Sequence, residues 1–118
     1  MQVRVERVSR LHYARVIRVA MSSGDGEIEL EVPEKVLREA GLSLKEGDAL
    51  ELEVAKERGE LDNWDLVMTG EVYLKLSNPP RVYASLGGLQ LVLKRENSYE
   101  EFRVGDKVYV KVRRMGGG

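Results

Sequence analysis

Apolar and polar residues alternate along most of this chain, with a period of two that is typical of β-strands with one buried face. Such alternation occupies residues 28–32, 50–54, 66–76 and 108–112. The first 21 residues are rich in β-branched side chains and change phase between Val5 and Val8. This change predicts strands with a bend or a bulge between them. The pattern as a whole predicts a fold made mainly of strands.

One short helix is expected to interrupt these strands. Pro33 suits a first helical position, and Gly41 suits the residue at which a helix stops. Between them, Val36, Leu37 and Ala40 share one helical face. The spacing predicts a helix of about two turns that packs this face against the strands.

Glycines inside the strand patterns predict strong curvature. Gly70 lies within the ladder of residues 66–76, where glycine marks a sharp bend or the close approach of another backbone. At Gly87 and Gly88 the apolar residues change from even to odd positions, which we interpret as a β-bulge inside one strand. Seven or eight strongly bent strands predict an all-β fold with one short helix. The expected architecture is a small closed antiparallel β-barrel of the oligonucleotide-binding kind.

The length of 118 residues fits one domain. We expect residues 1–115 to form this single barrel domain and the glycines at 116–118 to form a flexible tail. Residues 44–54 and 102–112 also resemble each other, since each segment has an apolar anchor, a Gly-Asp turn and an alternating strand. The similarity indicates either an internal duplication or ordinary turn chemistry.

The composition excludes several classes of protein. The chain has no cysteine, so it has no disulfide framework, thiol catalysis, Fe–S cluster or cysteine zinc site. No apolar run approaches the roughly 20 residues that span a bilayer, and the N-terminus alternates charged residues with valine. We therefore expect no membrane association and a location inside the cell.

The net charge of −1 hides an uneven distribution. Residues 1–18 hold five arginines and one acid, and residues 63–118 hold nine bases and six acids; these are the basic ends. Residues 19–62, the acidic middle, hold 5 bases and 13 acids. The basic ends are either a nucleic-acid footprint or charges that protect exposed strands from other chains. Because the whole chain is near neutral, the protective interpretation is favoured.

The sequence provides little for catalysis. His12 is the single histidine, and no second histidine or cysteine accompanies it as a metal ligand. The carboxylates alternate with apolar residues, which places them on solvated strand faces. No phosphate-binding glycine loop, calcium loop or nucleophile motif occurs. We expect no catalytic residue, no metal site and no cofactor.

Tyrosines and bases share the outward phases of three predicted strands. They are Tyr73 with Lys75, Tyr83 with Ser85, and Tyr109 with Lys111 and Arg113. Aromatic side chains with interleaved bases stack single-stranded bases on small barrels. Tyrosine and arginine are also enriched at protein–protein contacts. The residues alone predict a binding barrel and leave its partner open.

Three segments, 64–73, 82–93 and 102–114, carry a resemblance to a known family. Their most specific part is Val-Met-x-Gly-x-Val-Tyr followed by Ser-x-Gly-Gly-Leu, and residues 7–12 add a weaker likeness near the start. Together they resemble the eighth small subunit shared by the eukaryotic nuclear RNA polymerases and the archaeal counterpart of that subunit. The short linker at residues 56–63, where eukaryotic members carry a longer loop, favours an archaeal form.

The resemblance implies a cytoplasmic, non-catalytic assembly subunit of DNA-directed RNA polymerase. Such a subunit docks on the largest subunit, outside the active centre, supports transcription, and makes weak or no direct contact with nucleic acid. The residues expected to contact the partner are Tyr73, Tyr83, Ser85, Leu86, Gly87, Gly88, Leu89 and Tyr109.

Residues 32–48 support an alternative. Their Pro-helix-Gly-turn order resembles the short DNA-binding domain of transition-state regulators and antitoxins, which are dimers of swapped hairpins. These residues lie within the acidic middle of the chain, whose charge opposes a surface that contacts DNA. The polymerase subunit is therefore the first interpretation and the DNA-binding regulator is the alternative.

Overall fold

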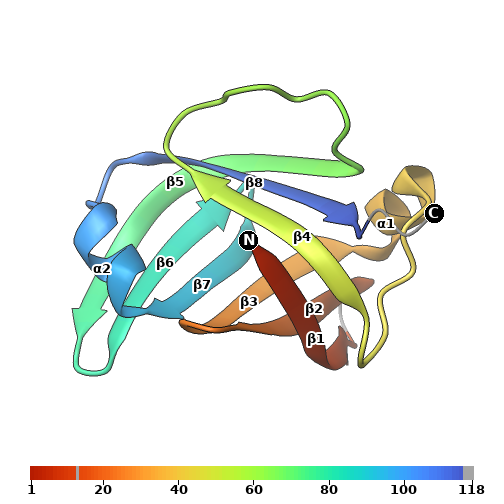
Figure 1. The fold of residues 1–118 in the computed structure, drawn as a ribbon, viewed down its shortest axis with the longest axis horizontal. Helices are drawn as coiled ribbons and strands as arrows, with labels where there is room; N and C mark the ends of the chain where they lie inside the picture. The colour runs from red at the N-terminus through yellow and green to blue at the C-terminus, as the bar shows by residue number, and fades with distance from the viewer. Residues whose placement is uncertain (13, 116–118) are drawn as a thin grey trace.

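The computed structural model describes residues 1–12 and 14–115. These residues form eight strands and two short helices (Figure 1). In chain order the elements are β1 (Gln2–Leu11), β2 (Val16–Ser23), β3 (Gly26–Pro33), α1 (Glu34–Ala40), β4 (Ala49–Ala55), β5 (Leu66–Ser77), β6 (Pro80–Leu86), β7 (Leu89–Arg95), α2 (Glu96–Glu101) and β8 (Lys107–Arg114). Neither helix is long enough to cross a membrane among the described residues.

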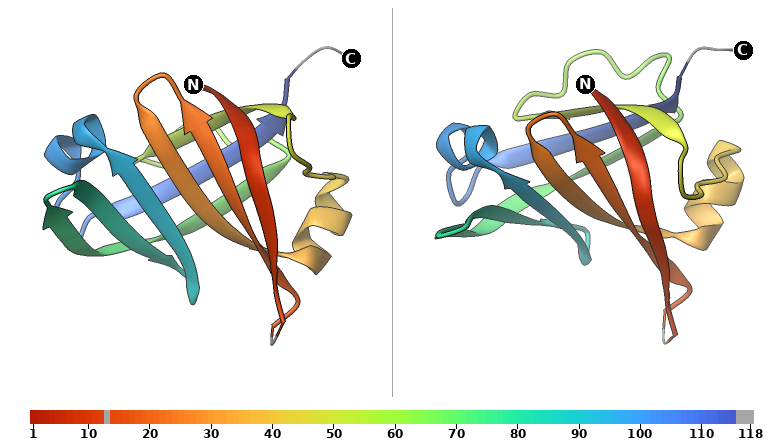
Figure 2. Two further views of the ribbon diagram at one scale, coloured as in Figure 1. Left: turned by 90° about the horizontal axis from the view of Figure 1, so that it is seen from below. Right: turned by 60° about the horizontal axis from the view of Figure 1, so that its bottom comes forward.

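The eight strands close into one antiparallel barrel in the order β1-β2-β3-β7-β6-β5-β8-β4. The closing contact between β1 and β4 is short and runs from Gln2 to Arg4. Figure 2 shows β1, β2 and β3 crossing in front of β4, β5 and β8, so the core lies between these two groups of strands. The predicted all-β fold, a small closed antiparallel barrel, is confirmed. The glycine tail predicted at 116–118 lies outside the described residues.

The chain consists of two halves with the same order of elements. Strands β1, β2 and β3, helix α1 and strand β4 form the first half; β5, β6 and β7, α2 and β8 form the second. In the barrel the halves meet where β3 pairs with β7 and where β4 pairs with β8. Figure 1 shows α2 and α1 at opposite ends of the barrel, as this arrangement requires. The similarity between residues 44–54 and 102–112 thus belongs to a repeat of the whole topology.

The two Gly-Asp turns make the same backbone hydrogen bonds. In the first half, Gly47 donates to the carbonyl of Val5, whose own N–H donates to Asp48. In the second half, Gly105 donates to the carbonyl of Val72, whose N–H donates to Asp106. All four N···O distances are 2.8–2.9 Å.

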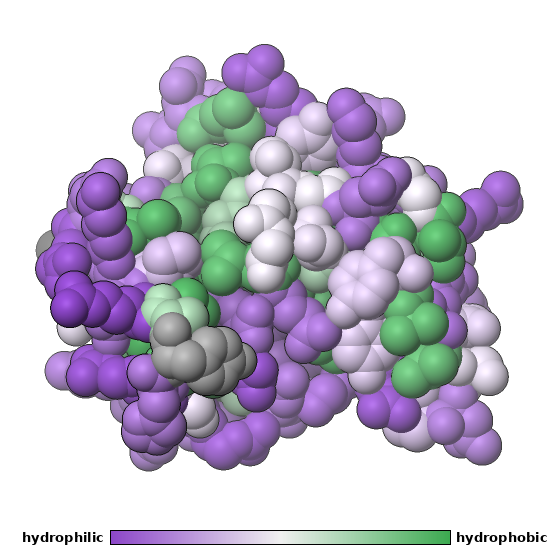
Figure 3. All heavy atoms as spheres, turned by 180° about the vertical axis from the view of Figure 1, so that it is seen from behind, coloured by the Kyte–Doolittle hydropathy of each residue, from purple (hydrophilic) through white to green (hydrophobic). Residues whose placement is uncertain are grey.

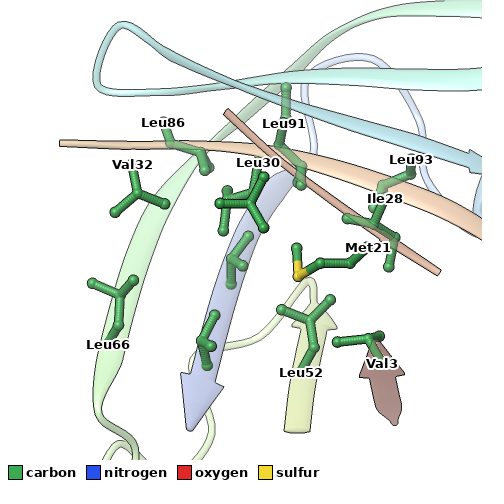
Figure 4. Packing of buried hydrophobic residues seen from close by; sticks show 14 of the residues in the cluster. Val3, Met21, Ile28, Leu30, Val32, Leu52, Leu66, Leu86, Leu91 and Leu93 are labelled. Atoms are coloured by element: carbon green, nitrogen blue, oxygen red, sulfur yellow. The ribbon is translucent and has the colours of Figure 1, made fainter. Parts of the chain in front are cut away.

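The inward faces of the strands supply the core. Figure 4 shows side chains from several strands meeting inside the barrel, among them Met21, Leu52 and Leu91. Burial of each such side chain contributes about 1.5–3 kcal/mol. Phe102, at the end of α2, is 1% exposed and also belongs to this core.

The predicted helix is present as α1. Pro33 occupies its N-cap position, and Gly41 ends it in the left-handed conformation with φ of 70°. Leu37 is buried, and Val36 and Ala40 pack against the core. A second helix, α2, was not predicted, because its residues Glu-Asn-Ser-Tyr-Glu-Glu show no apolar period of 3.6.

A β-bulge follows the Gly-Asp contact in each half. Between β1 and β2 the extra residue is Glu6, which confirms the predicted irregularity near Val5. Between β5 and β6 the extra residue is Tyr73, which no sequence feature indicated. Each bulge reverses which residues of the strand point outward from there on.

The bulge at Tyr73 makes part of the predicted ladder wrong. Leu74 and Leu76 were expected to point inward with the rest of residues 66–76, yet they are 40% and 37% exposed. Lys75, expected to point outward, instead lies with its Nζ 4.1 Å from the centroid of the Tyr99 ring in α2.

The β-bulge predicted at Gly87 and Gly88 is wrong. These residues form the two-residue turn that joins β6 to β7, with φ of 63° and 95°. Both values lie in the left-handed region that two-residue hairpin turns require. The change of apolar phase therefore marks a hairpin and not an extra residue inside one strand.

Gly70 lies at a close approach between β5 and β6. A Cβ atom at this position would come within 1.9 Å of the backbone oxygen of Ser85 and 2.8 Å of the Cα of Leu86. Of the two interpretations that the sequence offered for Gly70, a sharp bend or a close backbone approach, the close approach is confirmed. Only glycine permits this contact without movement of a strand.

We predict that Gly70→Ala lowers the free energy of unfolding by about 3 kcal/mol, because two backbones must separate to admit one methyl group. Gly24→Ala is the matched control, since a Cβ there meets nothing within 4 Å, and it should change stability by less than about 0.5 kcal/mol. Urea denaturation of both variants measures the difference. Equal stability of the two variants would contradict the close approach.

Candidate functional site

Folding brings the basic ends and the acidic middle together. The part of the chain that the structure describes holds eleven ion pairs, and eight of them join a base of the basic ends to an acid of the acidic middle. Arg7 with Glu27 at 2.9 Å and Arg18 with Glu31 at 2.8 Å are examples. The charges that looked segregated in the sequence neutralise one another, which favours their protective interpretation.

Lys111 of β8 is engaged inside the chain. Its side chain is 1% exposed although it points out of the barrel, because the loop between β4 and β5 covers it. Its Nζ donates to the backbone oxygen of Glu60 at 2.6 Å and pairs with Glu53 at 3.2 Å. This ammonium group is not available to a phosphate.

Arg113 is similarly occupied. Its guanidinium lies 4.5 Å from the centroid of the Trp64 ring, and its Nε donates to the carboxylate of Glu51. This side-chain hydrogen bond lowers the pKa of Glu51 below its usual value. Two of the bases that the sequence offered for nucleic-acid stacking are therefore structural.

A groove of about 440 Å³ lies on the outside of the barrel, over β3, β7, β6 and β5. It lies just beyond the end of the β3–β7 pairing, whose last register pair is Leu30 with Leu91. The residues that line it are Glu31, Tyr73, Ala84, Ser85, Gly88, Leu89 and Gln90.

Gln90 ties the two sides of the groove together. Its backbone N–H donates to Glu31 at 2.8 Å, and its side-chain amide donates to the hydroxyl of Tyr73, also at 2.8 Å. Glu31 is held in turn by Arg18. On the other wall, the N–H of Gly88 donates to the hydroxyl of Ser85 at 3.3 Å. The groove is thus formed by fixed polar groups that no partner is needed to position.

Two tyrosines stand beside each other at the edge of the groove. The rings of Tyr73 and Tyr83 have centroids 6.2 Å apart and an interplanar angle of 49°. The Tyr83 hydroxyl accepts a hydrogen bond from Arg81 at 3.3 Å. Tyr73 is 48% exposed, so a large amphipathic ring is presented to solvent. Tyrosine and arginine in such a cluster are the residues that dominate protein contacts.

Most of the predicted contact residues come together here. Tyr73, Ser85, Gly88 and Leu89 line the groove, Tyr83 stands beside Tyr73, and Gly87 lies in the adjoining turn.

Two of the predicted contact residues lie elsewhere. Leu86 is 4% exposed and points into the core, so it is not a surface contact (Figure 4). Tyr109 pairs with Thr69 on β5 and lines a smaller hollow of about 270 Å³ between β5 and β8.

Sequence reasoning missed three polar residues of this face. Gln90 directly follows a predicted contact residue, and its polar side chain within an apolar run was a usable signal. Glu31 is one of several alternating glutamates, so nothing set it apart before β3 was seen beside β7. Arg81 follows two prolines and carried no pattern.

Figure 3 shows the side of the molecule opposite to that of Figure 1. Apolar side chains gather there in separate patches, with hydrophilic side chains between them. Among the described residues, no group of three or more histidine, cysteine, aspartate or glutamate side chains could hold a metal ion.

Comparison with known proteins adds one strong match. The model of the family described as RNA polymerase Rpb8 matches residues 34–114, which is 81 of the 118 residues. This stretch contains every residue of the groove except Glu31. It also runs through α1 and on to residue 48, and so contains most of the region, residues 32–48, that the sequence left open to a DNA-binding interpretation. No curated protein matches the chain.

Among solved structures, the cytoplasmic molybdate-binding protein ModG, in a crystal form with molybdate bound, is 15% identical to this chain. The alignment covers 95% of this chain and 87% of that one, with a TM-score of 0.41. At that score the likeness carries no argument about the ligand of this chain.

We predict that the Glu51–Arg113 pair makes stability depend on pH in the acid range. The folded pKa of Glu51 lies below its ordinary value of 4.5, so the pair stabilises the fold above pH 4.5 and this contribution disappears as pH falls through the folded pKa. Glu51→Gln should therefore be less stable than the unmodified chain at pH 7, and the two should converge at low pH. Thermal unfolding between about pH 3 and 7 tests this, and parallel curves would contradict it.

We also predict that the isolated chain binds single-stranded nucleic acid weakly, because eight ion pairs among the described residues already join basic side chains of the basic ends to acids of the acidic middle. Fluorescence anisotropy with a labelled oligonucleotide should show no saturable binding at about 0.3 M salt. Tight binding that persists at that salt concentration would restore the nucleic-acid interpretation of the basic ends.

Proposed function

Because the chain belongs to the RNA polymerase Rpb8 family, we propose that it is a non-catalytic assembly subunit of archaeal DNA-directed RNA polymerase that docks on the largest subunit. The observation that carries this proposal is the family match over residues 34–114, together with the groove that lies almost wholly inside it. The subunit would support transcription by holding the complex in order, and the chemistry would belong to other subunits.

The groove and its two tyrosines are the proposed docking face. Tyr73 and Tyr83 offer large contact area with few rotatable bonds, and they stand over a set of polar groups that is already fixed by Gln90. A preformed surface of this kind loses little conformational entropy on binding. Six of the eight contact residues expected from the sequence lie on or beside this face, and Leu86 and Tyr109 are not part of the proposal.

The archaeal and cytoplasmic parts of the proposal rest on the loop between β4 and β5. It spans only residues 56–65, and Lys111 and Arg113 hold it against β8 through Glu60 and Trp64. Eukaryotic members were expected to carry a longer loop here. The shortness of this loop is the feature that favours an archaeal subunit, which would work in the cytoplasm.

The DNA-binding alternative has less support. In a regulator made of swapped hairpins, residues 32–48 would pair with a second copy of the chain. Here the segment leads into β4, which pairs with β1 and β8 of the same chain.

We predict that Ser85→Arg lowers recovery of tagged chain with the polymerase by at least about tenfold. Ser85 is exposed and lines the groove, so the longer side chain fills it without entering the core. The matched control is Ser9→Arg, an exposed serine at an outward position of β1. Both variants are compared by affinity capture from their own cells and by circular dichroism for folding.

We expect the unmodified chain and Ser9→Arg to recover the large polymerase subunits. We expect Ser85→Arg to lose them. Recovery with a folded Ser85→Arg at the level of the control would show that docking uses another face. Capture of the unmodified chain without polymerase subunits would contradict the function itself.

A further inference from the structure

Within residues 1–12 and 14–115, two strands of the barrel have part of one edge without a neighbouring strand. Strand β5 pairs with β8 only as far as Glu71, and the turn at Gly105 and Asp106 then closes on Val72. Beyond that point, residues 73–77 pair with β6 on one side, and no described residue pairs with them on the other. In the same way, β1 has no strand paired on one side after Val5 among the residues that the structure describes. Free edges of this kind accept strands from other chains.

The two edges carry opposite chemistry at equivalent positions. Counting from the valine that each turn contacts, Arg7 corresponds to Leu74 and Ser9 to Leu76. Arg7 forms an ion pair with Glu27, so the β1 edge bears the charge that usually prevents pairing with other strands. The β5 edge bears two leucines that are 40% and 37% exposed.

The β5 edge has no outward charged side chain to prevent strand pairing, and the bulge at Tyr73 explains why. The bulge at Tyr73 turns Lys75 toward α2, where its Nζ lies over the Tyr99 ring, and turns the two leucines outward. Val104, 61% exposed, lies in the turn that contacts Val72 and extends the apolar surface along the same edge. Exposed apolar groups beside unpaired backbone are what strand addition uses.

The hairpin also has an unbalanced charge. Residues 72–86 contain two bases, Lys75 and Arg81, and no acid, although the chain as a whole has a net charge of −1. Neither base has a carboxylate partner among the ion pairs of the described residues. The Nε of Arg81 is buried and has no hydrogen-bond partner in that part of the chain. The hairpin itself therefore carries a net positive charge, which is complementary to a negatively charged segment.

We propose that residues 73–77 accept an extended, acidic segment of the polymerase partner as an added strand. Backbone groups of the segment would pair with the free edge of β5, where β8 would lie if it continued. Apolar side chains of the segment would pack on Leu74 and Leu76, and its carboxylates would be attracted by the net positive charge of the β5–β6 hairpin. This inference rests on the proposed function and deepens it, because it states the conformation and chemistry of what docks.

Hydrogen exchange on the assembled polymerase tests this proposal. Amides of residues 73–77 should exchange at least about tenfold more slowly in purified polymerase than in the isolated chain. The equivalent amides of residues 6–10 on the β1 edge are the internal control and should not change. Sedimentation of the isolated chain at two concentrations accompanies the measurement and detects self-association.

A pair of variants tests the side chains. Leu76→Glu places a negative charge against the acidic segment and should reduce incorporation into polymerase at least about tenfold. Ser9→Glu makes the equivalent change on the β1 edge and should incorporate as the unmodified chain does. Both positions are exposed or nearly so, and circular dichroism verifies that each variant is folded.

The outcomes separate this inference from the proposed function. A chain that enters polymerase while residues 73–77 remain unprotected would disprove strand addition and leave the function intact. Protection of residues 73–77 in a concentration-dependent dimer of the isolated chain would identify a second copy as the occupant and disprove the acidic partner segment. A chain that does not enter polymerase would disprove both.

Discussion

The hydrogen bonds between each Gly-Asp turn and the first strand of its half are the constraint on which the rest of the molecule depends. By bonding to Val5 and Val72, these turns end the ladder to β4 and to β8 at fixed residues. A bulge follows immediately in each strand, and the two hairpins leave the barrel. The exposed leucines, the inward Lys75 and the position of Tyr73 beside the groove all follow from where those ladders stop.

Sequence periodicity predicted the barrel because most strands here have one buried face and one solvent-exposed face. It also placed α1 between Pro33 and Gly41 and recognised that Gly70 meets another backbone. It failed where a local change of phase has two explanations. A hairpin turn and a bulge both shift alternation by one residue, so Gly87-Gly88 was misread, while the bulge at Tyr73 lies in a run whose residues alternate without interruption.

The sequence predicted those residues of the candidate site that lie close together along the chain. Tyr83, Ser85 and Gly88 belong to one hairpin, so a motif recognises them together. Glu31 reaches the groove only because β3 pairs with β7, a contact across 59 residues to Gln90. Leu86 was assigned to the surface with its neighbours, although alternation along β6 turns it into the core. Non-local pairing and side-chain direction are the physical information that a linear motif lacks.

The repeated topology has a consequence for symmetry and stoichiometry. A homodimer of one half would close the same barrel around a two-fold axis, and it would show two identical free edges. Each edge would bind a partner, so one homodimer would bind two partner molecules or would assemble with them into open-ended polymers. Joining both halves in one polypeptide allows them to differ, as Arg7 and Leu74 do. A covalent pseudo-dimer can thereby attach once and in one orientation, which is what a large asymmetric complex requires of a single-copy component.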